Sequence, residues 1–239
     1  MIEIVKVENK EQEKEFVMFP FALYKGCDYW VPPIISEELE SMDKEKNPVF
    51  ENAEAEFYIA KKDGVTVGRI AAMVNWVEIE EQKKNKLRFG WYDTIDDLEV
   101  SKKLLESVIE FGKKRKLEFV DGPVGFSNMD KAGLLIEGYE ELNTMITWYH
   151  YPYQKEHLKK LGFSKLAEWV EYKIKIFSAE DAPEKVKKFS KIIQQRYELK
   201  VLNFKSRKEI VPYVDKMFEL LNVTYSNLQT YVTLSLIHI

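Results

Sequence analysis

The order of apolar and polar positions predicts alternating strands and helices over the first 178 residues. Residues 2–7 alternate as in a strand, and residues 57–74 form a predicted β-hairpin because two apolar runs flank Asp63-Gly64. Further strands are expected at 87–92, 119–120 and 169–176, and helices around 16–23, around 154–161, and from a cap at Asp96 or Asp97 to an end near residues 113–116. This order predicts a mixed α/β (α+β) sheet and excludes a doubly wound one.

A second unit begins near residue 179. Residues 183–197 and 209–225 have helical apolar spacing, residues 200–204 are strand-like, and Tyr231-Val232 resembles the start of a further strand. The expected organisation is therefore one domain over 1–178 and the start of a second over 179–233. The last six residues, 234–239, match the translation of a transposase sequencing adapter, so we expect a non-native tail and a missing C-terminal half.

Composition narrows the possible partners. The 36 basic and 40 acidic residues give a net charge of -4, which leaves no basic excess for binding nucleic acid. The single Cys27 cannot form an internal disulfide, the N-terminus lacks a signal-peptide pattern, and no apolar run reaches the length of a bilayer span. We expect a cytoplasmic protein whose contact with lipid is at most peripheral. One cysteine and three histidines also make a metal site unexpected.

Several short motifs resemble one bacterial family. They are residues 19–26, Trp30-Val31-Pro32-Pro33, Asp63-Gly64 with 67–70, Gly122-Pro123 with 125–127, and Tyr151-Pro152-Tyr153 before 157–163. The chain resembles, through about Tyr231, GNAT-like proteins that include the bacterial ceramide synthases. The resemblance implies a mixed, mostly antiparallel sheet flanked by helices, with a second GNAT-like half after it. It also implies acyl transfer from acyl-CoA to an amine, such as a sphingoid-type or other lipid amine.

The phosphate-binding motif of GNAT enzymes is absent at its expected place. Those enzymes grip the CoA diphosphate with an Arg/Gln-x-x-Gly-x-Gly/Ala motif at a helix start, where free amides and the helix dipole favour an anion. Here the corresponding residues include Asp96, Asp97 and Glu99, and we expect the two aspartates to be helix caps. Acyl-CoA is therefore expected as a co-substrate of the full-length protein, bound by the missing half.

Two residues are candidates for catalysis. The tyrosine that many GNAT enzymes use as an acid corresponds to Leu158 here, whereas Tyr153 lies nearby in the sequence. His150 has a side chain whose usual pKa suits a base. Packing of aromatic residues and a structural histidine are the alternative interpretations.

The loop after residue 122 is the candidate for holding the acceptor. Its closely spaced glycines allow close approach of the backbone, and its polar side chains suit an amine or hydroxyl group. The alternative is a loop whose polar side chains bond their own backbone. The candidate substrate-binding residues are Gly125, Phe126, Ser127, Asn128, Asp130, Glu137 and Tyr151.

The sequence thus predicts an N-acyltransferase-like protein in which this half supplies the scaffold and the acceptor side. The fragment alone is expected to be inactive. Two alternatives from other classes stay open: a non-catalytic ligand-binding module with the GNAT fold, and a dimerisation module.

Overall fold

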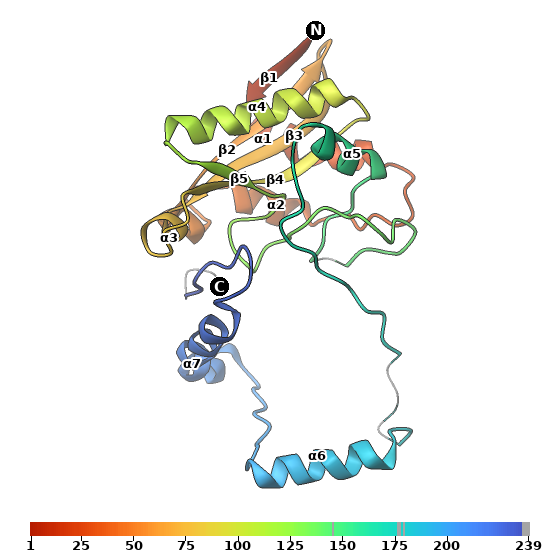
Figure 1. Cartoon of the computed structure of the whole chain (residues 1–239), viewed down its shortest axis with the longest axis vertical. Coiled ribbons are helices and arrows are strands. Elements are labelled where there is room, and N and C mark those ends of the chain that lie inside the picture. Colours follow the sequence, from red (N-terminus) through yellow and green to blue (C-terminus); the bar gives the residue numbers. More distant parts are fainter. Residues whose placement is uncertain (145, 176–177, 179, 236–239) are drawn as a thin grey trace. The chain divides into compact units, whose positions relative to one another are not determined.

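The computed structural model describes residues 1–144, 146–175, 178 and 180–235 (Figure 1). By its packing the chain divides into two units, one of residues 1–168 with 218–239 and one of residues 169–217. The predicted limits at residues 178 and 233 divide the chain by its resemblance to two GNAT-like domains, and not by its packing. These limits stay predictions.

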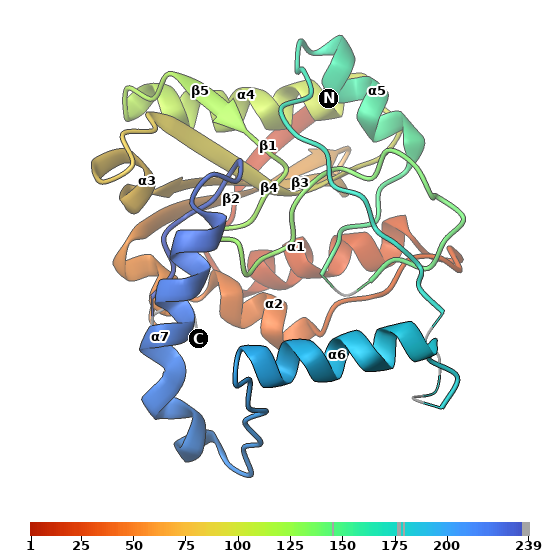
Figure 2. The ribbon, with the colours of Figure 1, turned by 60° about the horizontal axis from the view of Figure 1, so that its bottom comes forward.

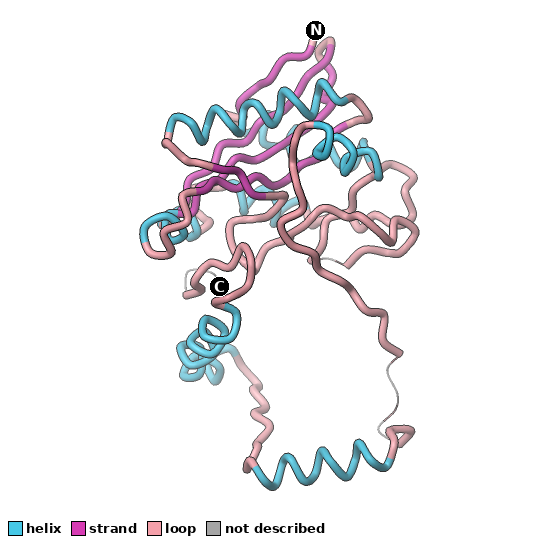
Figure 3. The backbone as a smooth tube through the Cα atoms, viewed as in Figure 1, coloured by secondary structure: helices cyan, strands magenta, loops and turns pink. Residues whose placement is uncertain are grey.

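The first unit is built around one five-stranded sheet, whose strands lie side by side in sequence order (Figure 3). The first four strands pair antiparallel, and the fifth runs parallel to the fourth over three residue pairs. This arrangement confirms the predicted mixed, mostly antiparallel sheet. The strands are β1 (Ile2–Lys6), β2 (Ala53–Lys62), β3 (Val65–Asn75), β4 (Lys86–Thr94) and β5 (Phe119–Asp121).

Helices cover both faces of the sheet (Figure 2). On one face lies α4 (Leu98–Lys114), against which Ile70 and Ala72 of β3 pack. On the other lie α1 (Lys10–Leu23) and α2 (Ile35–Met42), which enclose Ala71 and Met73 of the same strand. Because both faces are buried, β3 reads as a nearly continuous apolar run.

The shorter helices are fixed by local contacts. The helix α5 (Pro152–Lys160) confirms the predicted helix and adds Leu158 to the core beneath α4. Three unpredicted elements are α2, the 3-10 turn η1 (Pro48–Glu51) and α3 (Trp76–Glu80). The start of α3 is set by the side chain of Asn75, which accepts a hydrogen bond from the Val77 N–H at 3.0 Å.

A β-bulge distorts β4 near its end. Arg69 pairs with Asp93 and Ala71 pairs with Gly90, so the single residue between them on β3 lies opposite two residues on β4. One of these is Trp91, whose φ of 47° is in the left-handed region. Bulges re-aim the side chains beside them, and this one lies where β4 extends beyond β5.

Two predicted strands are wrong over the described residues. Residues 169–175 and 200–204 lie outside any sheet, and residue 176 lies outside the described part. Trp169, Tyr172 and Ile174 are all more than half exposed, although alternation predicted one buried face. An apolar alternation makes a strand only where a neighbouring strand pairs with its backbone. Tyr231-Val232 is likewise no strand, and its backbone is bonded in another way, described below.

The two helices predicted at residues 183–197 and 209–225 are present. They are α6 (Glu184–Arg196) and α7 (Arg207–Tyr225), and α7 contains Pro212 in its first turns. No residue of α6 is buried, so its apolar side chains are exposed to solvent.

A buried group of four charges holds one end of the sheet. The Arg88 guanidinium forms a two-pronged pair with Glu78 of α3, at 2.7 and 2.8 Å, and both residues are no more than 1% exposed. Lys86 joins them by contacts of 3.1 Å to Glu78 and 2.7 Å to Asp121 at the end of β5. Burial alone would raise the pKa of Glu78, but Arg88 and Lys86 hold it below its ordinary value. Two acids and two bases leave this group neutral, which makes its burial tolerable.

Breaking this group is expected to destabilise the whole fold. Glu78→Gln leaves Arg88 and Lys86 buried with too few negative partners, and we expect a loss of about 3–5 kcal/mol in the free energy of unfolding. Urea unfolding followed by circular dichroism measures this loss. The control is Glu110→Gln, which removes an exposed pair with Lys113 and is expected to leave the free energy of unfolding nearly unchanged, because solvent screens exposed pairs. Equal losses in the two variants would contradict a structural role for the buried group.

Candidate functional site

The loop that follows β5 is held by its own side chains and by its neighbours. Ser127 donates its backbone N–H to Asp130 Oδ2 at 2.8 Å, and its hydroxyl accepts from the Met129 N–H at 3.2 Å. The carbonyl of Gly125 accepts from Arg88 at 3.0 Å, and that of Phe126 accepts from Asn75 at 3.1 Å. Some polar groups of the loop are therefore hydrogen-bonded within the fold. This is what the alternative interpretation expected, namely a loop whose polar side chains bond their own backbone.

The remaining loop candidates differ in their surroundings. Asn128 is bonded to the backbone of Val232, described below. Gly125 has no room for a side chain, since a Cβ there would meet the Cβ of Asp130 at 2.2 Å. Glu137 is solvent-exposed, and it lies apart from the Ser127 turn in the sequence.

A buried polar cluster lies at the far end of β4. Tyr24, at the end of α1, donates its hydroxyl to Asp93 Oδ1 at 2.7 Å, and the Tyr149 carbonyl lies 3.0 Å from the same hydroxyl. Arg69 Nε donates to Asp93 Oδ2 at 2.8 Å. Sequence reasoning missed Tyr24, Arg69 and Asp93, although a charged residue inside the apolar run 67–74 was a usable signal.

Aromatic rings surround this cluster. The Tyr24 ring lies 5.1 Å from that of Tyr151 and 5.3 Å from that of Trp30, between ring centroids. Tyr151 also stacks on Tyr153 at 5.7 Å. Tyr151 is half-buried, so its ring forms part of the outer surface of this aromatic group. Of the candidates, the structure brings Tyr151, Tyr153 and His150 together here.

Both candidate catalytic groups are already hydrogen-bonded within the fold. His150 is 1% exposed, and its Nδ1 lies 3.3 Å from the Leu135 N–H, which donates to it. Burial lowers the pKa of His150 to about 4, so the ring is neutral at pH 7. Tyr153 donates its hydroxyl to the Thr94 carbonyl at 2.7 Å, and burial raises the pKa of that hydroxyl.

Side chains of α5 cover the free edge of β4. Strand β5 pairs with β4 only as far as Arg88, and the chain then leaves through Gly122-Pro123. Beyond that point Gln154 Nε2 donates to the Tyr92 carbonyl at 3.1 Å, next to the bond from Tyr153 to Thr94. The backbone edge that the parting strands expose is thus bonded by α5.

Carboxylates occupy the start of α4. The side chain of Asp97 accepts from the Glu99 N–H at 3.0 Å and pairs with Lys62 at 3.0 Å, which confirms it as the helix cap. The sequence also predicted Asp96 as a cap, and this is wrong, because its Oδ1 instead lies 3.2 Å from His157 Nε2. An anion approaching this helix end would meet fixed negative charge.

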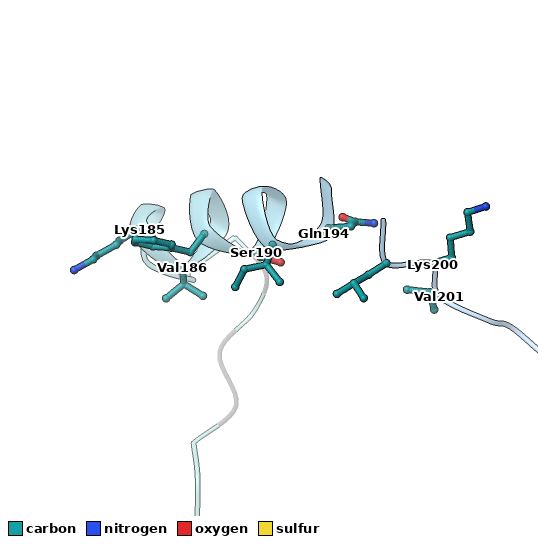
Figure 4. Close-up of a pocket in the computed structure, with 9 residues that line it drawn as sticks. Lys185, Val186, Ser190, Gln194, Lys200 and Val201 are labelled. Carbon is teal, nitrogen blue, oxygen red and sulfur yellow. The ribbon is translucent and has the colours of Figure 1, made fainter. Parts of the chain in front are cut away.

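The second unit contains an open hollow of about 700 Å³ beside α6 (Figure 4). Its lining is mainly apolar, and its members are Lys185, Val186, Phe189, Ser190, Ile193, Gln194, Leu199, Lys200 and Val201.

The described residues contain neither a metal-ligand cluster nor a membrane-spanning helix. No set of three or more histidine, cysteine, aspartate or glutamate side chains there is arranged to hold a metal ion. Among the described helices, none combines the length and apolar character that a membrane span requires.

Two curated proteins are similar in sequence, whereas no family model matches the chain. Protein YghO of Escherichia coli (strain K12) is 31% identical over 167 residues, covering 68% of this chain and 43% of YghO. Bacterial ceramide synthase of Caulobacter vibrioides (strain NA1000 / CB15N) is 23% identical over 174 residues, covering 72% of this chain and 45% of that protein. The matched part spans less than half the length of either relative.

Among solved structures, one similar to this chain is a predicted acetyltransferase with acetyl-CoA from Clostridium acetobutylicum. It is 12% identical, covers 72% of this chain and 96% of its own, and superposes with a TM-score of 0.43.

The relatives found by sequence and the fold of the chain lead to the same kind of protein. The sequence motifs, the mixed five-stranded sheet with helices on both faces, and the match to a bacterial ceramide synthase agree with one another. By its fold the chain is GNAT-like, and by its sequence it is ceramide synthase-like.

Proposed function

We propose that the complete protein transfers an acyl group from acyl-CoA to an amine, and that this half is its scaffold and acceptor side. The observation that carries the proposal is the similarity to a bacterial ceramide synthase over 174 residues. A sphingoid-type or other lipid amine is the proposed acceptor class, and peripheral contact with a membrane would deliver it.

The reaction forms a bond to the carbonyl carbon, breaks the thioester bond and moves a proton from the amine to the leaving thiolate. The amine nitrogen attacks the thioester carbonyl carbon, a base takes a proton from that nitrogen, and the C–S bond breaks to release a thiolate that is then protonated. His150 is buried and bonded, and the Tyr153 hydroxyl already donates to a carbonyl. We therefore place the proton-transfer groups outside this pair and assign the pair to positioning the aromatic cluster.

Binding of CoA is proposed to belong to the other half. Two features of this half support that division: carboxylates at the start of α4, and α5 side chains along the β4 edge. A diphosphate at the α4 start would replace a satisfied cap with like-charge repulsion. Residues 179–233 would begin the second GNAT-like domain, and the apolar hollow beside α6 would be part of its interior.

The acceptor is proposed to contact the loop from Gly125 to Asp130, Tyr151 and Glu137. An exposed carboxylate at Glu137 suits a protonated amine before reaction, and the half-buried Tyr151 ring offers an apolar and cation-binding face.

A non-catalytic ligand-binding module is the second candidate. It is favoured by one observation, namely that both candidate catalytic side chains are bonded to the backbone. Such a module would bind amines without consuming the thioester, so release of free thiol from acyl-CoA separates the two functions.

The present chain is expected not to bind CoA. At a CoA concentration of about 1 mM we expect no rise in its melting temperature. A protein extended through the second domain should gain about 2.7 kcal/mol at a concentration a hundred times the Kd. Differential scanning fluorimetry measures both. A clear shift with the present chain would contradict the proposed division between the halves. Failure of the longer protein to release thiol with any long-chain amine would contradict acyl transfer.

In that longer protein, Glu137→Gln is expected to raise the KM for the amine about three- to fivefold with little change in kcat, since an exposed ion pair contributes up to about 1 kcal/mol. Initial rates of thiol release against amine concentration measure both constants. Glu140→Gln, an exposed neighbour, is the matched control. An equal change in both variants would mean that Glu137 has no specific contact.

Burial of neutral His150 makes stability depend on pH. Its pKa is about 4 in the folded chain and about 6.5 when unfolded, so between these values the unfolded chain binds more protons. The free energy of unfolding should therefore fall as the pH falls, by about 2 kcal/mol from pH 7 to pH 5 on this account. Urea unfolding at several pH values measures the slope. His150→Asn should flatten it, and an unchanged slope would show that His150 is not its source.

A further inference from the structure

The first three residues of the segment Thr230–Thr233 are buried, although the segment belongs to no helix or strand. Val232 is 0% exposed and Tyr231 is 4% exposed, in a part of the chain whose other residues are mostly exposed. The segment belongs to the same unit as the sheet. The side chains of Tyr231 and Val232 are therefore packed inside the first unit.

Side chains of the sheet unit bond successive backbone groups of this segment. Asn128 donates from Nδ2 to the Val232 carbonyl at 2.9 Å and accepts from the Val232 N–H at 3.4 Å. Arg88 donates to the Thr230 carbonyl at 2.6 Å, and Lys84 donates to the Tyr231 carbonyl at 3.2 Å. One amide side chain thus bonds both polar groups of one residue, as a neighbouring strand would.

Two of these three side chains connect the segment to the loop after β5. Asn128 is part of that loop, and Arg88 donates to the Gly125 carbonyl as well as to the Thr230 carbonyl. The loop closes on itself through the Gly125 N–H to the Lys131 carbonyl at 3.0 Å and the Gly133 N–H to the Pro123 carbonyl at 2.8 Å. Loop and segment are therefore linked directly through Asn128 and indirectly through Arg88, so moving one relative to the other breaks these bonds.

We propose that residues 122–133 and 230–233 act as one coupled latch, in which seating of the segment fixes the loop and its release loosens the loop. The coupling connects residues 230–233 to the loop proposed to hold the acceptor. It does not depend on acyl transfer being the reaction. While Asn128 holds Val232, its amide is unavailable to a ligand, so a ligand that uses this amide must release the segment.

Amide hydrogen exchange tests the coupling on the whole chain. Asn128→Ala is expected to speed exchange of the Val232 amide about tenfold, since two side-chain hydrogen bonds are lost. The Gly125 and Gly133 amides should also exchange several times faster. Met129→Ala, at an exposed neighbouring position, is the matched control and should leave all three amides unchanged.

The reverse direction uses the segment. Coupling is reciprocal, so Val232→Ala, which removes buried side-chain atoms of the segment and changes no loop residue, should also speed exchange at Gly125 and Gly133. The Ile70 amide in β3 serves as the internal reference for global unfolding, and the Val232→Ala result decides the matter if Asn128→Ala also changes Ile70. Unchanged exchange at Gly125 and Gly133 when the segment is loosened would overturn the proposal, as would an unchanged Val232 amide in Asn128→Ala.

Discussion

The rest of the first unit depends on the buried pair between Arg88 and Glu78. A guanidinium and a carboxylate that are both out of water persist only if they are fully bonded, so their partners must be brought to them. These partners come from α3, from the end of β5 through Lys86 and Asp121, and from the backbone at Gly125 and Thr230. One electrostatic requirement therefore fixes the place where β4 and β5 part and where the loop turns away.

A second buried acid lies at the other end of β4. Asp93 is held by Arg69 and Tyr24, and the bulge at Trp91 separates this end from the paired part of the strand. Here α5 takes the edge carbonyls that β5 has left. Both ends of the strand are thus closed by side chains, and this is the physical basis for proposing that the half works as a scaffold and acceptor side while CoA binds elsewhere.

The loop candidates combine two roles that the sequence could not separate. Ser127 and Asp130 stabilise a turn, as their residue types predict. Asn128 is directed instead to a segment more than a hundred residues later in the chain. The loop is therefore joined both to the core, through Arg88, and to the segment Thr230–Thr233, through Asn128, and these bonds are the basis of the proposed coupling between segment and acceptor loop.

The sequence by itself determined the hairpin, the amphipathic α4 and the resemblance to GNAT-like proteins, because each of these depends on local spacing or a short motif. It placed the cap of α4 at Asp96 or Asp97, and the structure decided for Asp97. That the start of α4 is unsuited to a diphosphate stays a prediction. Tertiary structure alone decided the rest. Alternation at 169–175 predicted a strand that has no pairing neighbour, and the burial of Glu78, Arg88 and Asp93 follows from partners far away in the chain. A pattern of residues fixes which face is apolar, whereas pairing of strands and burial of charge depend on what the fold places opposite.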